Sequence, residues 1–192
     1  MARPREQRVD EAVRAAVREL LVAEGYQATT VQAVARRAGV SAPSIYRRWS
    51  NQADLVQAVV FPDVPADLPE AGDDLRSDLE LWLHLLYDTL TETAARVALP
   101  GLLTDYQRDP AAYERLVDRT EVPVRAAFAA MVATHVAAGR AGSGADPDVL
   151  FDLVLGVELV ATLVPGRRDV DALLHHAAAA IAAAATARGP SG

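Results

Sequence analysis

Two short helical patterns meet at Gly39, and this junction constrains the fold more than any other feature of the chain. Apolar residues recur at helical spacing after Thr30, which is a good N-cap, and glycine can take the left-handed backbone of a tight turn between helices. The second pattern follows Ser41 and carries a proline, which a first helical turn tolerates. Val40 and Ile45 stand where a hydrophobic staple would set the entry angle of this helix. We therefore expect a helix-turn-helix.

The composition favours helices throughout. Of the 192 residues 51% are hydrophobic; alanine is abundant, and alternating runs of β-branched residues are nearly absent. The absence of cysteine excludes disulfides, thiolate metal sites and cysteine nucleophiles. The N-terminus is too charged for a signal peptide, and the most apolar segment, VLFDLVLGVELVATLV, is too short and too acidic for a membrane span. We expect an all-α, soluble, cytoplasmic protein with no membrane partner, no cofactor and no metal.

A proline-rich, acidic stretch after residue 60, FPDVPADLPEAGDD, is the clearest break in the chain. Residues 1–60 hold nine arginines against six acids, and residues 61–192 hold ten arginines against twenty acids, with no lysine anywhere. A basic head on an acidic body suggests two tasks, although chance clustering of solvated charges would give the same counts. We expect one domain over residues 1–60 and a second over residues 61–192.

Longer helices are expected after the break. One begins near Asp74 and runs towards the mid-90s, and a short element follows around residues 102–106. Asp-Pro pairs at 109–110 and 146–147 each combine an N-cap with a proline at the first helical position. Pro123 should kink or break the segment that the first pair opens. Asp169 opens a last helix with an alanine-rich stripe.

The residues around the second helix of the motif suit DNA reading. Small side chains at its start let the backbone approach base edges in the major groove. Tyr46 can donate its hydroxyl to a phosphate, and Arg47 and Arg48 can neutralise phosphates or bind guanine. Ile45 and Trp49 should face inward and hold the helix on its scaffold. The alternative is an ordinary helical hairpin with a solvated basic face.

These residues resemble the DNA-binding domain of the tetracycline-repressor (TetR) family of bacterial transcriptional regulators. The resemblance covers residues 7–60 and is carried by GYQATTVQAVARRAGVSAPSIYRRWSNQADLVQAVV. It implies an N-terminal three-helix helix-turn-helix DNA-binding domain and a C-terminal helical ligand-binding and dimerisation domain. It also implies a homodimer on a palindromic, double-stranded DNA operator, released by a small-molecule effector.

The resemblance also places site residues. DNA contacts fall by position on Thr30, Gln32, Ser41, Ala42, Pro43, Ser44, Tyr46, Arg47 and Arg48. A lysine that often follows the Asn51 cap in this family is Gln52 here, and we expect this glutamine to project towards the DNA backbone.

The last two helices are the expected dimer interface, because the one over residues 149–164 is apolar on nearly every face. Burial within one monomer is the alternative. The residues expected at the interface are Leu150, Val154, Val157, Leu174, Ala178, Ile181 and Ala185. Glu158 lies in the same helix and must be paired, reach the rim or face a cavity.

The effector pocket is less constrained. Its candidates are bulky or polar-tipped residues of the second domain, each of which could equally belong to the core: Trp82, His84, Tyr87, Tyr106, Tyr113, Phe128, Met131 and His135. No cluster of cations suggests an anionic effector, so an uncharged, largely apolar or aromatic ligand is expected.

Other functions are less well supported by the residues. An enzyme would need a nucleophile–base pair or metal-ligand spacing, and no such motif occurs; His175 and His176 are adjacent and point about 100° apart on a helix. A helix-turn-helix regulator without an effector, or one that activates transcription, stays open as an alternative to a ligand-released repressor.

Overall fold

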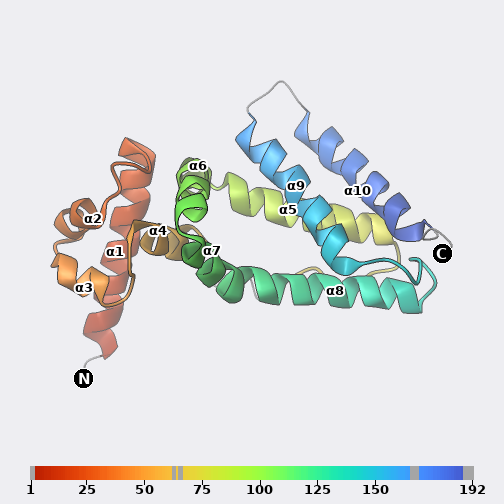
Figure 1. Ribbon diagram of the computed structural model, residues 1–192, viewed down its shortest axis with the longest axis horizontal. Coiled ribbons are helices and arrows are strands. Elements are labelled where there is room, and N and C mark those ends of the chain that lie inside the picture. Colours follow the sequence, from red (N-terminus) through yellow and green to blue (C-terminus); the bar gives the residue numbers. More distant parts are fainter. Residues whose placement is uncertain (1–2, 62–63, 65–66, 165–168, 188–192) are drawn as a thin grey trace. The chain divides into compact units, whose positions relative to one another are not determined.

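The computed structural model of the chain describes residues 3–61, 64, 67–164 and 169–187, with side chains from Gln7 onward. Helices are the regular structure throughout this part, which confirms the all-α expectation (Figure 1). Its packing forms two compact units. The N-terminal unit comprises Met1–Asp63 and Glu92–Asp118, and the C-terminal unit comprises Val64–Thr91 and Arg119–Gly192. None of the described helices is both long and apolar enough to cross a membrane.

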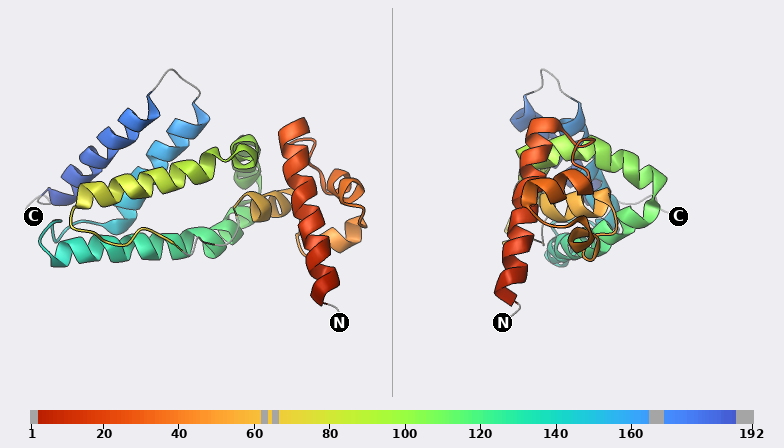
Figure 2. Two further views of the ribbon diagram at one scale, coloured as in Figure 1. Left: turned by 180° about the vertical axis from the view of Figure 1, so that it is seen from behind. Right: turned by 90° about the vertical axis from the view of Figure 1, so that its left-hand side faces the viewer.

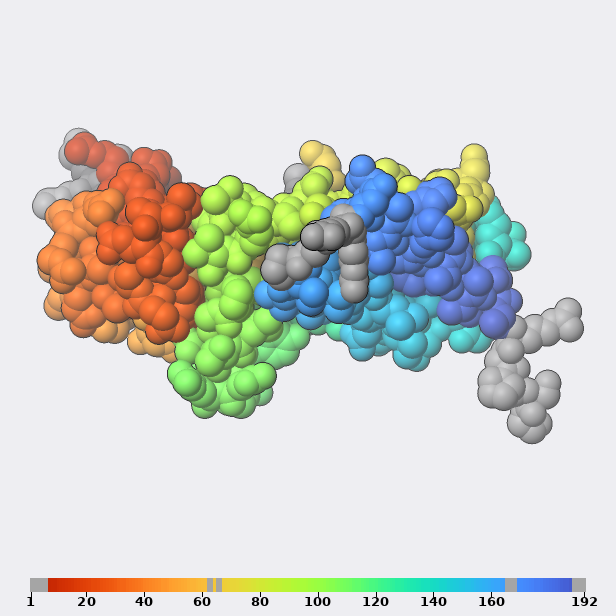
Figure 3. Space-filling model, turned by 90° about the horizontal axis from the view of Figure 1, so that it is seen from above, coloured from red at the N-terminus to blue at the C-terminus, as the bar shows by residue number. Residues whose placement is uncertain are grey.

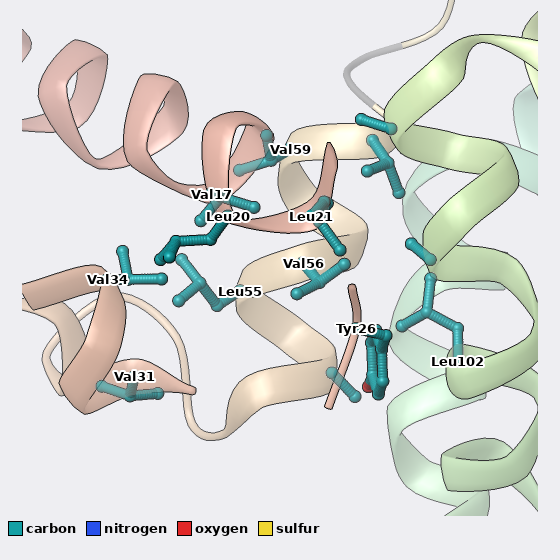
Figure 4. Packing of buried hydrophobic residues seen from close by; sticks show 14 of the residues in the cluster. Val17, Leu20, Leu21, Tyr26, Val31, Val34, Leu55, Val56, Val59 and Leu102 are labelled. Carbon is teal, nitrogen blue, oxygen red and sulfur yellow. The ribbon is translucent and has the colours of Figure 1, made fainter. Parts of the chain in front are cut away.

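The N-terminal unit is built on a long first helix. Its elements are α1 (Arg3–Glu24), α2 (Val31–Ala38), α3 (Ala42–Tyr46), α4 (Gln52–Val60), α6 (Thr93–Arg108) and α7 (Pro110–Leu116). Figure 4 shows Leu20 and Leu21 of α1 packed against Leu55 and Val56 of α4, with Val34 of α2 closing the core. These side chains are at most 3% exposed, so α1 and α4 form the scaffold on which the short helices are held.

Two helices from beyond the acidic stretch join this core. Ala94, Ala95, Ala98 and Leu102 of α6 and Ala112 of α7 pack in the same hydrophobic cluster as α1 and α4. The packing division therefore differs from the boundary expected after residue 60. The prediction of a separate short element at 102–106 is wrong, because α6 is one helix that continues through Pro100.

Gly101 explains why α6 can lie so close. A Cβ at this position would stand 2.1 Å from Cδ1 of Tyr26. The Tyr26 ring is buried, and its hydroxyl donates to Asp105 Oδ2 at 2.5 Å, so the ring is held from both ends. Burial and the adjacent Asp105 carboxylate raise the pKa of Tyr26, which keeps its hydroxyl protonated as the donor.

We expect Gly101→Ala to lower the free energy of unfolding by about 1–3 kcal/mol, because the added methyl group overlaps a ring that cannot move. Gly144→Ala is the matched control, since a Cβ there meets nothing within 4 Å. Denaturant unfolding followed by far-UV circular dichroism measures both variants. Equal stability of the two would contradict the close approach.

The C-terminal unit contains longer helices. They are α5 (Leu75–Thr91), α8 (Val122–Ala137), α9 (Pro147–Leu163) and α10 (Val170–Thr186). A π-helical turn, η1 (Val117–Glu121), precedes α8, so Pro123 stands at the start of α8 and the chain is interrupted just before it. Figures 1 and 2 show α5 crossing the unit between α8 and α10, with α9 running from α8 to the side of α10. Asp146 and Asp169 cap α9 and α10 with their side chains, as expected.

Aromatic rings fill the centre of this unit. Trp82 of α5 meets Phe128 of α8 edge to face at 5.3 Å between centroids, and Phe128 meets Phe151 of α9 at 5.4 Å. All three rings are at most 2% exposed. The row fixes α5, α8 and α9 against one another.

The buried side chain of His135 forms hydrogen bonds near the C-terminal end of α8. Arg140 Nε donates to Nδ1 of His135 at 2.9 Å, so the proton of that imidazole is on Nε2, which donates to Asp78 Oδ2 at 2.6 Å. The same Asp78 oxygen accepts from Gly72 N at 2.7 Å. The histidine is thus a structural link between α8, α5 and the loop before α5.

Candidate nucleic-acid interface and effector site

The helix-turn-helix is formed by local interactions. Thr30 caps α2 by accepting from Ala33 N at 3.2 Å. Gly39 closes the helix with φ 67° and ψ 31°, the left-handed backbone that the sequence predicted. Ile45 is buried and Val40 packs against the same core, consistent with the expected staple. This geometry fixes the direction in which α3 leaves the turn.

A row of polar side chains lies on the outer surface of α2 and α3. Ser41 stands at the N-cap of α3, but its hydroxyl bonds Ser44 Oγ at 2.8 Å instead of capping a backbone N–H. Tyr46 is 47% exposed, and Gln32 Nε2 lies 3.5 Å from its hydroxyl. Arg47 is exposed and donates to Ser44 Oγ at 3.2 Å. Hydroxyl, amide and guanidinium groups are the usual partners of phosphates and base edges.

Several arginines of the basic head are used inside the unit. Arg14 and Arg18 donate to the carbonyls of Ala58 and Val59 at 2.9 and 3.0 Å, where they satisfy the C-terminal turn of α4. Arg37 pairs with two glutamates of α1. The basic excess of residues 1–60 therefore overstates the charge available to a nucleic acid.

Arg48 and Gln52, both expected to contact DNA, have partners within the N-terminal unit. Arg48 Nε forms an ion pair with Asp10 Oδ1 of α1 at 3.0 Å. Gln52, which was expected to project towards the DNA backbone, donates its amide to the Tyr26 carbonyl at 2.7 Å. A glutamine can close this loop with a neutral hydrogen bond, whereas a lysine would bring a charge to a half-buried position.

A polar network joins α4 to α6 and α7. Asp54 is 6% exposed; its Oδ1 accepts from Arg115 Nη2 at 2.8 Å and Nε at 2.9 Å. Gln57 donates to the Ala112 carbonyl and accepts from the Tyr106 hydroxyl at 2.9 Å. Sequence reasoning missed this network, because its partners lie 49 to 61 residues further along the chain.

The eight candidate effector residues are divided between the two units. Tyr106 and Tyr113 belong to the N-terminal unit and pack against each other at 5.3 Å between ring centroids. In the C-terminal unit, Phe128 and Met131 are core residues, and His135 is held by its two polar neighbours. Trp82 is also buried, but its indole N–H has no partner, as is true of Nδ1 of half-buried His84. Tyr87 is half-buried on the same helix, α5.

The predicted dimer residues are almost all inside the protomer. Leu150, Val154, Leu174, Ala178, Ile181 and Ala185 are at most 4% exposed within the C-terminal unit's own core, and Val157 is half-buried. The outer face of α9 carries a different stripe: Val149, Leu153, Gly156, Val160 and Val164. In Figure 3, α9 and α10 lie side by side in blue on the surface that faces the viewer. We call the five residues the α9 outer stripe.

Family models match both parts of the chain. Residues 13–59 match the model of bacterial regulatory proteins of the tetR family. Residues 68–181 match a tetracyclin repressor-like C-terminal domain.

Individual proteins agree with these models. The chain is 29% identical over 149 residues to an uncharacterized HTH-type transcriptional regulator, Rv1556, from Mycobacterium tuberculosis, covering 77% of this chain and 73% of that protein. It is 26% identical over 137 residues to the DNA-binding transcriptional repressor TetR of Mycobacteroides abscessus, covering 70% and 72%. The fold is similar to that of NalD from Pseudomonas aeruginosa, with a TM-score of 0.62 and 22% identity over 92% of this chain and 96% of NalD. This chain is therefore a helix-turn-helix transcriptional regulator of the tetR family.

Proposed function

We propose that the protein binds a palindromic operator as a homodimer in the cytoplasm and represses transcription until a small effector enters its C-terminal unit. The observation that carries the DNA part is the outer row of exposed Ser41, Tyr46 and Arg47 with half-buried Ser44, which Gly39 holds in a fixed direction. The family of the chain and the repressor among its relatives support the repressor role.

Selection of bound sites from a random duplex library tests this proposal. Two recognition helices related by a two-fold axis require two inverted half-sites, about 34–36 Å or a multiple of that distance apart. We expect a palindrome protected as one footprint by a dimer. A monomer on a single asymmetric half-site would contradict the proposal.

The α9 outer stripe supports dimerisation. Its residues recur at spacings of three and four, so they lie on one side of the helix. Val149 and Leu153 are 55% and 45% exposed, and an apolar row of this kind is a usual protein-interaction surface. At its centre, a Cβ on Gly156 would meet nothing within 4 Å, and the outer residues of α10 at Ala180, Ala183 and Ala184 are small. Two copies could therefore approach closely as a four-helix interface.

We expect Leu153→Arg to raise the dimer dissociation constant at least ~100-fold, because the two-fold axis places two unpaired charges in one apolar interface. Operator affinity should fall with it. Leu81→Arg is the control, because Leu81 is an exposed residue of α5. It should leave the dimer intact. Sedimentation equilibrium measures both variants, and a dimeric Leu153→Arg protein would exclude this face.

The effector response is supported by the way the N-terminal unit is built. Asp54 accepts from Arg115 of α7, and Gln57 donates to Ala112 of α7 and accepts from Tyr106 of α6, so α4, next to the DNA-reading helices, is tied to both. A ligand that displaces α6 and α7 would displace α4 as well and change the placement of α3. A regulator without an effector would keep its operator affinity in the presence of every ligand that the C-terminal unit binds.

A further inference from the structure

Glu158 of α9 is the least satisfied charged residue among those described. Its side chain is fully buried, and neither carboxyl oxygen has a hydrogen-bond partner. Buried carboxyl groups in folded proteins are normally hydrogen-bonded or paired with a cation, so an orphaned one requires an explanation. Of the three roles expected for it from the sequence, exposure at the rim does not occur, and no described residue pairs with it.

Other unpartnered polar atoms lie along the same pair of helices. The indole N–H of Trp82 on α5 and the hydroxyl of Thr162, one turn beyond Glu158 on α9, are buried without partners. Helices α5 and α9 pack against each other, with Leu85, Leu86 and Leu155 half-buried at the same core. The contact between α5 and α9 therefore combines apolar side chains with several unused polar groups, and these are the kinds of group that make up a small-molecule site.

The ionisable groups that interact at this contact, Glu158 and Asp88, are both acids. Burial, and to a smaller extent the charge of Asp88 of α5, raises the pKa of Glu158 to about 8. Asp88 itself is exposed, so the two carboxyl groups lie at different depths. No cation contributes to the environment of Glu158 among the described residues. A positive charge with its own N–H donors is the group that both carboxyls lack.

We propose that Glu158 and Asp88 form the cation-binding end of the effector site, and that the effector is a protonated organic amine with an apolar or aromatic body. The proposal rests on the proposed function in calling this ligand an effector. It replaces the uncharged ligand expected from the sequence. An amine suits the site better than a bare metal ion, because one N–H donor can reach each Glu158 oxygen while the carbon body contacts the leucines.

A matched set of probes tests the site without DNA. Naphthalen-1-ylmethylamine, naphthalen-1-ylmethanol and 1-naphthoic acid share one ring system and differ in charge. Trp49→Phe leaves Trp82 as the single tryptophan of the chain, so quenching of its fluorescence reports binding close to the site. At pH 8 we expect the amine to bind at least tenfold more tightly than the alcohol, and the acid to bind most weakly.

The pH dependence and the variants separate a specific ion pair from general affinity. Because the amine binds the ionised form of Glu158, its affinity should rise by up to about tenfold per pH unit between pH 6 and 8, and that of the alcohol should not. Glu158→Gln should remove both the preference and the pH dependence. Asp171→Asn, at an exposed position of α10, changes the net charge by the same amount. It should alter neither the preference for the amine nor the pH dependence of its binding.

Equal affinity for amine and alcohol, absence of amine binding, or a preference that survives Glu158→Gln would each overturn the proposal. Operator binding by the wild-type chain, measured separately, distinguishes this failure from a failure of the proposed function. A chain that binds its operator but not the amine contradicts only the amine site, and one that binds the amine but no operator contradicts only the regulator.

Discussion

Gly39→Val is expected to reduce operator affinity by at least tenfold while the dimer stays intact. The backbone at Gly39 has φ 67°, and its N–H closes α2 together with the bond from Val40 N to the Ala35 carbonyl at 3.0 Å. A β-branched residue in this conformation costs about 1–3 kcal/mol, and the chain can relieve that strain by rotating the turn. Rotation would move Ser41 and the rest of α3 away from their fixed direction.

Gly39→Asn is the matched control, because asparagine tolerates the left-handed region better than other side chains do. It should retain most of the operator affinity, whereas valine should not. Fluorescence anisotropy with operator and random duplexes measures the affinities, and sedimentation checks the dimer. Normal operator binding by the valine variant would show that the turn does not position α3.

The parts of the fold that could be predicted are those set by neighbouring residues. The caps at Thr30, Asn51, Asp146 and Asp169 each involve a backbone N–H two or three positions away, and the Gly39 turn involves carbonyls three and four positions back. Such interactions can be recognised in a short stretch of sequence. They located the ends of the helices and hence the helix-turn-helix.

The contacts that could not be predicted join distant residues. A short separate element was expected at 102–106, yet α6 is continuous there and the Tyr26 ring lies against its Gly101. Arg48 and Gln52 carry the side chains expected at a DNA surface, but their partners are Asp10 and the Tyr26 carbonyl, which no local pattern identifies. The contacts of a polar surface residue depend on the tertiary fold.

The orientation of α9 could not be predicted because the helix is apolar on nearly every side. Val154 and Leu153 are neighbours with similar hydrophobicity, but one is fully buried and the other is 45% exposed. The apolar pattern therefore did not distinguish the side of α9 that packs in the core from the side that is exposed. The two acids in the middle of the helix lie on opposite sides, because Asp152 is exposed and Glu158 is buried.

Glu158→Gln is expected to stabilise the protein in mildly alkaline buffer. In the unfolded chain this carboxyl titrates near its ordinary pKa of 4.5, whereas burial first, and then the Asp88 carboxylate, raise the pKa of Glu158 to about 8 in the folded chain. Between these values the folded state keeps a proton that the unfolded state has lost. The contribution of Glu158 to the free energy of unfolding must therefore fall as the pH rises through this window.

The fall is at most about 1.4 kcal/mol per pH unit and stops above the folded pKa, so the total penalty at pH 8 is at most about 4 kcal/mol. Glutamine has a similar shape and does not titrate, so Glu158→Gln should exceed the wild type in stability by an amount that grows from pH 5 to pH 8. Asp171→Asn should follow the wild-type curve. Urea unfolding at several pH values measures the difference between the curves. Parallel curves for the wild type and Glu158→Gln would mean that the carboxyl is solvated or paired in the folded protein, and the burial of an uncompensated acid between α5 and α9 would be wrong.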